Sequence, residues 1–389
     1  MQPCFLAVDI GASSGRHIVG TVQDGKITLQ EVYRFENGVR RENGRLCWNI
    51  DALAAEVVNG LKAAHDAGYT PATIGIDTWA VDFVLLDADG QRIGDAVAYR
   101  DERTEGMREA LERDYGLTFA EHYARTGIQY QKFNTVYQLM ALKKEHPEQL
   151  AAAKTFLMVP DYLNYLLCGV AANEYTNAST TALVGADSKD WDDALIAMLG
   201  LPRDIFQSIK TAGTVLGHLT PEMQAKVGFD AEVILPATHD TGSAFLAVPA
   251  RDEFAAYLSS GTWSLLGVEN AAAITSADSC AANFTNEGGY EYRYRYLKNI
   301  MGLWMIQSVR RELGEQNGTR PSFPELIAAA KEAADFASCV DPNDSRFLAP
   351  TSMIAEVKAA CADTHQPMPQ TTGEVMQCIY NSLTQDYRR

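Results

Sequence analysis

Two segments far apart in the sequence share one pattern. DIGASSGRHIVG, at 9–20, and LSSGTWSLLG, at 258–267, each place Ser-Ser-Gly between two apolar runs. A repeated strand–turn–strand unit predicts two related halves. The length of 389 residues also exceeds the size at which a single hydrophobic core usually stops growing. We therefore predict an α/β protein with two domains, 1–243 and 244–389.

The apolar patterning predicts a mixture of strands and helices. The continuous apolar run at 4–8 is typical of a strand buried on both faces, and 82–91 predicts a hairpin with its turn at Asp89-Gly90. In the predicted helix 48–68, either Asn49 or Asp51 can cap the start. The segment 162–193 has no regular pattern. The other predicted strands are 18–22, 27–35, 74–76, 233–236, 255–258, 264–268 and 294–300, and the other predicted helices are 134–145, 301–313, 324–334, 352–361 and 374–389.

The two Ser-Ser-Gly segments are suited to holding phosphate. A turn of small residues between buried strands exposes several backbone N–H groups at one point, and such a nest binds phosphate oxygens. Asp9, at the mouth of the first turn, is placed to bind Mg²⁺ directly or through water. A plain turn is the alternative. The sequence has no G-x-x-x-x-G-K-[ST] motif, and GASSGR opens a hairpin rather than a helix, so neither a P-loop nor a dinucleotide fingerprint is expected.

Asp240 is the candidate catalytic base. It follows a short apolar strand within THDTGSA, where a carboxylate could accept the proton of a substrate hydroxyl that attacks a γ-phosphoryl group. A helix N-cap is the alternative, because Asp before Thr-Gly-Ser-Ala caps helices well. We expect His239 to bind substrate or to pack rather than to bind metal, since no second His or Cys lies at ligand spacing.

A second polar cluster follows the predicted strand 74–76. It contains Asp77, Thr78, Trp79 and Asp82. Carboxylates beside an indole ring suit a sugar, which they bind through paired hydrogen bonds and ring stacking. Trp79 as an ordinary core residue is the alternative.

Charge and cysteine content exclude several classes of protein. The formal net charge of −17 repels phosphate backbones and anionic membranes, so we expect no nucleic-acid or membrane partner. The N-terminus lacks the basic region and long apolar stretch of a signal peptide, which predicts a cytoplasmic protein. The seven cysteines show no C-x-x-C spacing, so we expect reduced thiols, and only Cys361 and Cys378 lie close enough to suggest a disulfide.

Nine motifs, in order along nearly the whole chain, resemble one family. They are DIGASSGR, IGIDTWAVDFVLLD, AYRDERT, PDYLNYLLCG, EYTNASTT, THDTGSA, YLSSGTWSL, NEGG and LKNIMGLWMIQ. The chain resembles the FGGY family of carbohydrate kinases, and in particular those members that phosphorylate L-rhamnulose. The resemblance implies two actin-like (ribonuclease H-like) α/β domains around a cleft, a sugar-binding one followed by a nucleotide-binding one. It also implies ATP and Mg²⁺, with transfer of the γ-phosphoryl group to the 1-hydroxyl of L-rhamnulose in L-rhamnose breakdown.

The resemblance also assigns residues to the two ligands. Those implied for the nucleotide are Ala12, Ser13, Ser14, Gly15, Arg16, Thr262 and Gln307. Those implied for the ketose are His239, Asp240, Thr241 and Asn299, with Asp240 as proton acceptor. Ala80 stands where a relative can have a Gly in contact with the sugar, and its methyl group leaves a backbone contact intact.

The resemblance ends before the family's C-terminal part does. Family members continue with a strand, a Gly-rich adenosine loop and closing helices, so we expect an incomplete second domain whose last helix lacks a partner for Met376, Ile379, Tyr380 and Leu383. We therefore expect a truncated, monomeric form with weak or no kinase activity. The alternatives are a kinase of another ketose, such as L-fuculose or D-xylulose, and a non-catalytic sugar-binding remnant. A sugar-responsive regulator would need a DNA-binding helix pair or basic arm, and an actin-like filament protein would not need the sugar-site residues.

Overall fold

The computed structural model describes residues 4–252, 254–348 and 350–388. Within them the chain forms two compact units. The first is built from residues up to 252 together with 269–296, and the second from 254–268 together with 297–388. The chain therefore leaves the first unit, returns to it and leaves it again. The division into domains 1–243 and 244–389 stays a prediction.

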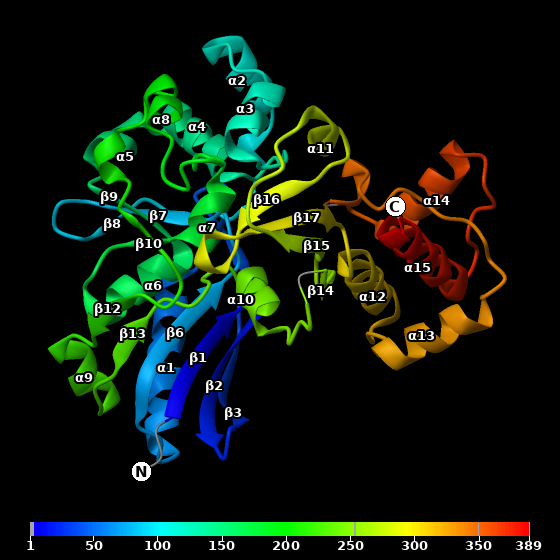
Figure 1. The fold of residues 1–389 in the computed structure, drawn as a ribbon. Helices are drawn as coiled ribbons and strands as arrows, with labels where there is room; N and C mark the ends of the chain where they lie inside the picture. Colours follow the sequence, from blue (N-terminus) through cyan, green and yellow to red (C-terminus); the bar gives the residue numbers. More distant parts are fainter. Residues whose placement is uncertain (1–3, 253, 349, 389) are drawn as a thin grey trace. The chain divides into compact units, whose positions relative to one another are not determined.

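A six-stranded sheet forms the base of the first unit. Its strands are β1 (Cys4–Ile10), β2 (Ser14–Gln23), β3 (Lys26–Glu36), β6 (Pro71–Thr78), β12 (Val215–His218) and β13 (Glu232–Ile234). Their order across the sheet is β12-β13-β6-β1-β2-β3 (Figure 1). β1 pairs antiparallel with β2 and parallel with β6, and β2 and β3 form the predicted hairpin. The predicted antiparallel start of the chain is thus confirmed.

One face of β1 is buried and the other is exposed. Leu6, Val8 and Ile10 lie in one apolar cluster with residues of α1 (Ile50–Asp66), whereas Phe5 is 41% exposed. The prediction of a strand buried on both faces is therefore wrong, because the described chain leaves the side that carries Phe5 open to solvent. α1 begins after Asn49, whose side chain accepts a hydrogen bond from the backbone N–H at position 52 (3.3 Å), so Asn49 is the cap.

Smaller sheets and short helices complete the first unit. β7 (Phe83–Leu86) pairs with β8 (Arg92–Ile93) as the predicted hairpin and also with β9 (Thr155–Met158). The prediction of an irregular segment from 162 is wrong at its start, because α6 (Val159–Cys168) places Leu163 and Leu167 in the core. The remaining elements are β4 (Val39–Glu42), β5 (Arg45–Trp48), β10 (Asn173–Glu174), β11 (Ile209–Lys210), β16 (Thr285–Gly288), α2 (Met107–Tyr115), α3 (Phe119–Thr126), α4 (Thr135–Glu145), α5 (Pro147–Ala152), α7 (Tyr175–Ala178), α8 (Asp193–Met198), α9 (Pro221–Val227), α10 (Asp240–Ala247) and α11 (Ala277–Ala281).

The second unit consists of a hairpin followed by packed helices. Its elements, of which β15 and β17 continue into the first unit, are β14 (Tyr257–Ser260), β15 (Ser264–Asn270), β17 (Tyr294–Ile300), α12 (Trp304–Asn317), α13 (Phe323–Glu332), α14 (Met353–Asp363) and α15 (Thr372–Arg388). The helices α13, α14 and α15 lie together, in orange to red in Figure 1. None of the helices in the described part of the chain is long and apolar enough to cross a bilayer.

The last helix is covered by its neighbours. Met376, Ile379 and Leu383 of α15 are buried in one cluster with apolar residues of α13 and α14, and Tyr380 packs against the same cluster. The expectation that these four side chains lack a partner is therefore wrong. Arg389, the last residue of the predicted helix, lies outside the described residues.

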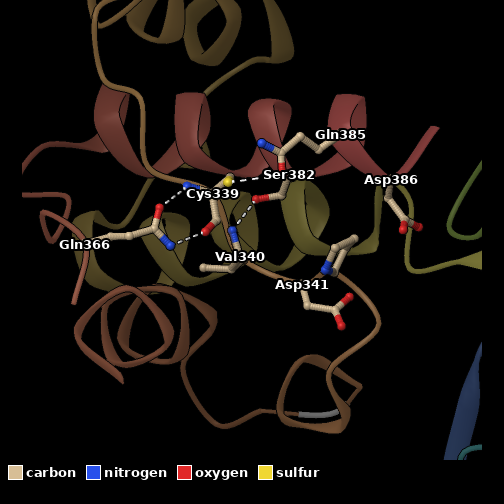
Figure 2. Close-up of a pocket in the computed structure, with 8 residues that line it drawn as sticks. Cys339, Val340, Asp341, Gln366, Ser382, Gln385 and Asp386 are labelled. Carbon is tan, nitrogen blue, oxygen red and sulfur yellow. Dashed lines mark hydrogen bonds between the residues drawn. The ribbon is translucent and has the colours of Figure 1, made fainter. Parts of the chain in front are cut away.

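Hydrogen bonds also connect Cys339 and Val340 to α15 and to the loop that precedes α15. Figure 2 shows them around a polar pocket of about 200 Å³. The side-chain amide of Gln366 bonds to both the N–H (3.0 Å) and the carbonyl (2.7 Å) of Cys339, and the Val340 N–H donates to the Ser382 hydroxyl at 2.8 Å. The pocket is lined by Cys339, Val340, Asp341, Pro342, Gln366, Ser382, Gln385 and Asp386.

The seven cysteines are present as free thiols. Cys361 and Cys378 are both buried, and their Sγ atoms lie 3.7 Å apart without a covalent bond. Burial raises the pKa of both thiols, so neither is an activated thiolate.

Both Ser-Ser-Gly segments form antiparallel hairpins, as predicted. A glycine begins each turn: the Gly11 N–H donates to the Ser14 carbonyl at 2.9 Å, and the Gly261 N–H donates to the Trp263 carbonyl at 2.8 Å. The Ser-Ser-Gly motifs themselves lie on opposite sides of their turns, because the first enters β2 whereas the second closes β14. The two hairpins therefore correspond through Gly11 and Gly261 rather than through the shared motif.

Candidate active site

The turn between β1 and β2 presents backbone donors. The Asn37 side chain donates to the Gly11 carbonyl at 2.9 Å, and the Asn37 N–H donates to the Ser13 carbonyl at 3.0 Å. In the part of the chain that the structure describes, the N–H groups of Ala12 and Ser13 have no protein partner. The turn thus has the free donors that a phosphate nest requires. Asn37 was not predicted, because its role depends on the pairing of β3 with the turn's strands.

Arg16 lies beside this turn in an ion pair with Asp9. Its Nε and Nη2 atoms donate to Asp9 Oδ2 at 2.9 and 2.7 Å. The side chains are 46% and 33% exposed, and exposed pairs contribute little stability. A polyphosphate could therefore compete with Asp9 for the guanidinium group, and the assignment of Arg16 to the nucleotide stays a prediction.

Three carboxylates gather at one edge of the main sheet. β1 and β6 run parallel with Asp9 opposite Asp77, and Asp240 follows a bridge between Thr78 and His239 that extends the sheet. Burial raises the pKa of Asp77 well above its usual range, and the charges of Asp9 and Asp240 raise it further. The sequence predicted each of these residues, but it assigned Asp77 to the sugar rather than to this carboxylate group.

The carboxylates suit a partly hydrated Mg²⁺ ion. Mg²⁺ binds one or two carboxylates and takes its other ligands from water and phosphate oxygens. Among the described residues, no three His, Cys, Asp or Glu side chains are grouped closely enough to hold a metal by themselves. The mutual repulsion of Asp9, Asp77 and Asp240 is what a cation at this edge would relieve, so these residues fit the ion.

Asp240 is the first residue of α10 and not its cap. The cap position belongs to His239, whose side chain makes no capping bond, so the structure does not favour the N-cap interpretation of Asp240. Burial raises the pKa of Asp240 to about 6, the Asp9 charge adds to this, and the bond from the Thr241 N–H (2.6 Å) opposes it. A carboxyl group that titrates near neutral pH is matched to general-base catalysis.

Asp82 holds two indole rings at the end of β6. Its Oδ2 accepts hydrogen bonds from Trp48 Nε1 (2.6 Å), Trp79 Nε1 (3.0 Å) and the Tyr99 N–H (3.1 Å), and its Oδ1 accepts one from Gln138 (3.0 Å). The ring centroids of Trp48 and Trp79 are 4.1 Å apart, and Asp82 is buried. This arrangement favours a supporting role for Asp82, and direct contact of Trp79 or Asp82 with a sugar stays a prediction.

A strained turn lies between these residues. The Asp82 N–H donates to the Ala80 carbonyl at 2.9 Å, and Val81 between them has φ = 67°. A β-branched residue in this region is a genuine outlier, and such strain persists only where neighbours enforce it. Two side chains of α4 do so: Thr135 Oγ1 and Gln138 Nε2 donate to the Val81 carbonyl at 2.7 and 3.2 Å. The assignment of Ala80 to the sugar stays a prediction.

A buried glutamate positions the segment that carries Asp240. Glu174 Oε2 accepts hydrogen bonds from the Thr238 N–H (2.9 Å) and Oγ1 (3.0 Å) and from the Thr176 N–H (2.9 Å). Glu174 was not predicted, although it lies in the hydroxyl-rich segment NEYTNASTT. Thr241, which was predicted, is buried next to Asp240 and donates to its Oδ1 at 3.2 Å.

Sequence reasoning also missed two partners of His239. Arg295 Nη2 lies 3.0 Å from His239 Nδ1, and Glu287 Oε2 lies 3.4 Å from the same atom. Both belong to the returning segment 269–296 of the first unit. Glu287 lies in NEGG, one of the family-like motifs, whereas Arg295 is a strand residue without any local signal.

Three predicted site residues belong to the second unit. Thr262 lies in the β14–β15 turn, where its carbonyl accepts a hydrogen bond from the Trp304 N–H (3.0 Å) at the start of α12. Gln307 lies one turn further along α12, and Asn299 lies in β17. The assignments of Thr262 and Gln307 to the nucleotide and of Asn299 to the ketose stay predictions.

Both parts of the chain match one family of enzymes. Residues 4–247 match the N-terminal domain of the FGGY family of carbohydrate kinases, and residues 256–389 match its C-terminal domain. The chain belongs to the FGGY family of carbohydrate kinases. The resemblance found in the motifs is thereby confirmed. FGGY kinases use ATP as the phosphoryl donor.

Several relatives cover almost all of this FGGY kinase. A rhamnulokinase of Oceanobacillus iheyensis is 52% identical over 100% of the chain and 81% of its own length. Rhamnulokinases of Halalkalibacterium halodurans and Klebsiella pneumoniae are 53% and 45% identical, over 98% and 99% of the chain and 80% and 77% of their own lengths. Among solved structures, a xylulose kinase of Lactobacillus acidophilus has a TM-score of 0.79 at 15% identity, over 98% of this chain and 76% of its own. A gluconate kinase of the same organism has a TM-score of 0.78 at 14% identity, over 100% and 77%. The solved structures support the fold.

Proposed function

We propose that the protein transfers the γ-phosphoryl group of ATP to the 1-hydroxyl of L-rhamnulose and so forms L-rhamnulose 1-phosphate in L-rhamnose breakdown. The observation that carries this proposal is the identity of 45–53% to three rhamnulokinases along nearly the whole chain. The site supports it, because a carboxyl group with a pKa of about 6 begins α10 beside two further carboxylates.

Each part of the site has a role in this reaction. Asp240 accepts the proton of the 1-hydroxyl as the oxygen attacks the γ-phosphorus, and His239 and Thr241 bind the ketose around it. The N–H groups of Ala12 and Ser13 bind phosphate oxygens, and Thr262 and Gln307 bind the nucleotide. Asp9 and Asp77 would hold Mg²⁺ through water, and the ion would neutralise charge on the phosphates.

The experiment that tests this proposal separates sugar binding from turnover. The purified chain is titrated by calorimetry with L-rhamnulose and, separately, with ATP and Mg²⁺, and the product is followed by ³¹P NMR. We expect L-rhamnulose to bind more tightly than L-fuculose or D-xylulose. Tighter binding or faster phosphorylation of another ketose would contradict the choice of substrate. Sugar binding without turnover would contradict the catalytic part alone and would support the expectation of weak or no kinase activity.

The variant Asp240→Asn tests the role of Asp240 as the catalytic base. The amide keeps the size of the side chain and can still bond to a hydroxyl group, but it cannot take its proton. We expect sugar affinity to change less than threefold and turnover to fall by about 100-fold or more. Retained turnover would remove Asp240 from the role of base.

We also propose a monomeric enzyme that acts in the cytoplasm. The acidic composition supports a protein that repels other acidic surfaces, including copies of itself. Light scattering after size-exclusion chromatography tests the oligomeric state directly, and a mass of twice 42.6 kDa would contradict it.

A further inference from the structure

His239 lies between the candidate base and a buried cation. It pairs with Thr78 at the end of the main sheet, and its side chain is 9% exposed. Its Nε2 atom lies 3.5 Å from Asp240 Oδ1, and its Nδ1 atom lies 3.0 Å from Arg295 Nη2. The two ring nitrogens therefore face two different partners. A neutral ring carries one proton, so one nitrogen donates a hydrogen bond and the other accepts one.

The contact with Arg295 decides where that proton lies. A guanidinium group has only donors, so a ring nitrogen 3.0 Å from Nη2 must present its lone pair. A proton on Nδ1 could reach Glu287 Oε2 only at 3.4 Å and would at the same time point two donors at each other. Nδ1 therefore carries no proton in this geometry, so the ring is neutral and its proton lies on Nε2.

Arg295 is itself held in place firmly. It is fully buried, its Nε donates to the Gly288 carbonyl at 2.8 Å, and its Nη1 lies 3.2 Å from Glu287 Oε2. The desolvation of a charged pair is costly and often outweighs its attraction. The Arg295–Glu287 pair is thus a weak source of folding stability. We therefore look for its role in the orientation of His239.

We propose that Arg295 is a positioning residue, which holds His239 in the tautomer with its proton on Nε2 so that this N–H donates to a ketose oxygen beside Asp240. The part of the proposal that concerns the ketose rests on the proposed function. In this arrangement Asp240 accepts from the sugar while His239 donates to it. The two neighbouring side chains thus distinguish a sugar hydroxyl that gives its proton to Asp240 from a sugar oxygen that accepts a hydrogen bond from His239.

The tautomer can be read without any ligand. Two-bond ¹H–¹⁵N spectra of the full chain with ¹⁵N-labelled histidine distinguish the two neutral tautomers and the charged ring, and His239→Gln assigns the signal. We expect the Nε2–H form at pH 7.5. In Arg295→Met, Nδ1 loses its donor and faces Glu287, so we expect the Nδ1–H form or a charged ring. An Nδ1–H ring in the unaltered protein, or an unchanged tautomer in Arg295→Met, would overturn the proposal.

A second variant guards against misfolding. Lysine also has donors and no acceptor, so Arg295→Lys should keep the Nε2–H form although its geometry differs. A switch to the Nδ1–H form in Arg295→Lys would contradict the proposal even if Arg295→Met does not fold. Arg293→Met makes the same change two positions earlier, at a half-buried residue, and should leave the His239 spectrum unaltered.

Calorimetry with L-rhamnulose tests the second part. Where Arg295→Met has the Nδ1–H form, a lone pair replaces the Nε2 donor, so we expect the Kd for L-rhamnulose to rise about tenfold, and Arg295→Lys to restore most of the affinity. An unchanged Kd in Arg295→Met together with a switched tautomer would overturn the contact with the ketose. If the unaltered protein does not bind L-rhamnulose, the proposed function fails, while the spectra still decide the tautomer.

Discussion

We expect Gly15→Ala to displace the turn between β1 and β2. Gly15 lies where β2 leaves this turn, and a Cβ atom there would lie 2.1–2.8 Å from three ring atoms of Phe35. The ring is 8% exposed, so it cannot swing freely into solvent. Either the ring or the hairpin must therefore move.

The size of the effect follows from two opposing contributions. Overpacking of a core costs about 1–3 kcal/mol, whereas replacing Gly reduces the entropy of the unfolded chain and gains about 0.4–1 kcal/mol. We expect a net loss of about 1–2 kcal/mol. Gly20→Ala is the matched control in the same strand, because the nearest atom to its new Cβ, Leu29 Cδ2, lies at an ordinary 3.6 Å. It should gain up to about 1 kcal/mol.

Urea unfolding and calorimetry with ATP measure the two consequences. Gly15→Ala should lower the unfolding free energy and weaken ATP binding, whereas Gly20→Ala should do neither. Phe35→Ala removes the clash, so the double variant Gly15→Ala/Phe35→Ala should lose less than the sum of the two single losses. Equal stability of Gly15→Ala and Gly20→Ala, or strictly additive losses, would refute the reasoning.

Three further predictions concern buried polar groups. Burial lowers the pKa of His17 from 6.5 to about 4, so its stabilising contribution is complete above pH 6.5 and falls by about 3 kcal/mol as the pH drops towards 4. His17→Gln should lack this pH dependence in urea unfolding, and an identical dependence would contradict the assignment. Asp82→Ala leaves three donors, Trp48 Nε1, Trp79 Nε1 and the Tyr99 N–H, without their acceptor and should lower the unfolding free energy by about 3 kcal/mol or more, and a loss below about 1 kcal/mol would be inconsistent with these bonds. Thr135→Val removes one of two donors to the Val81 carbonyl and should cost about 1 kcal/mol and weaken sugar binding; unchanged L-rhamnulose affinity by calorimetry would separate the strained turn from the sugar site.

Local patterns predicted much of the fold because their causes are local. The hairpins depend on residues a few positions apart and were predicted. The cap of α1 was predicted to be Asn49 or Asp51, and the structure has Asn49. The exposure of Phe5 depends on which layers cover the sheet, and the equivalence of Gly11 with Gly261 depends on the register of the strands. Neither layer nor register can be read from a short window of sequence.

The residues of the candidate site also divide into those that a local sequence pattern predicted and those that it did not. Asp9, Asp77 and Asp240 each follow an apolar strand, which is a pattern that sequence can show. The partners that orient the site come from distant positions: Trp48 for Asp82, and Glu287 and Arg295 for His239. Their roles arise only when strands far apart in the sequence become neighbours.

Because residues 269–296 return to the first unit, no single position in the sequence divides the chain into its two units. Tyr123 Oη donates to the Phe284 carbonyl at 2.8 Å, and the Asn286 N–H donates to the Gly127 carbonyl at 2.9 Å. Chimeras that exchange sugar specificity between relatives would therefore have to transplant this stretch with its N-terminal partner. Evolution would face the same linkage, so the stretch should be inherited with the half of the gene that precedes it.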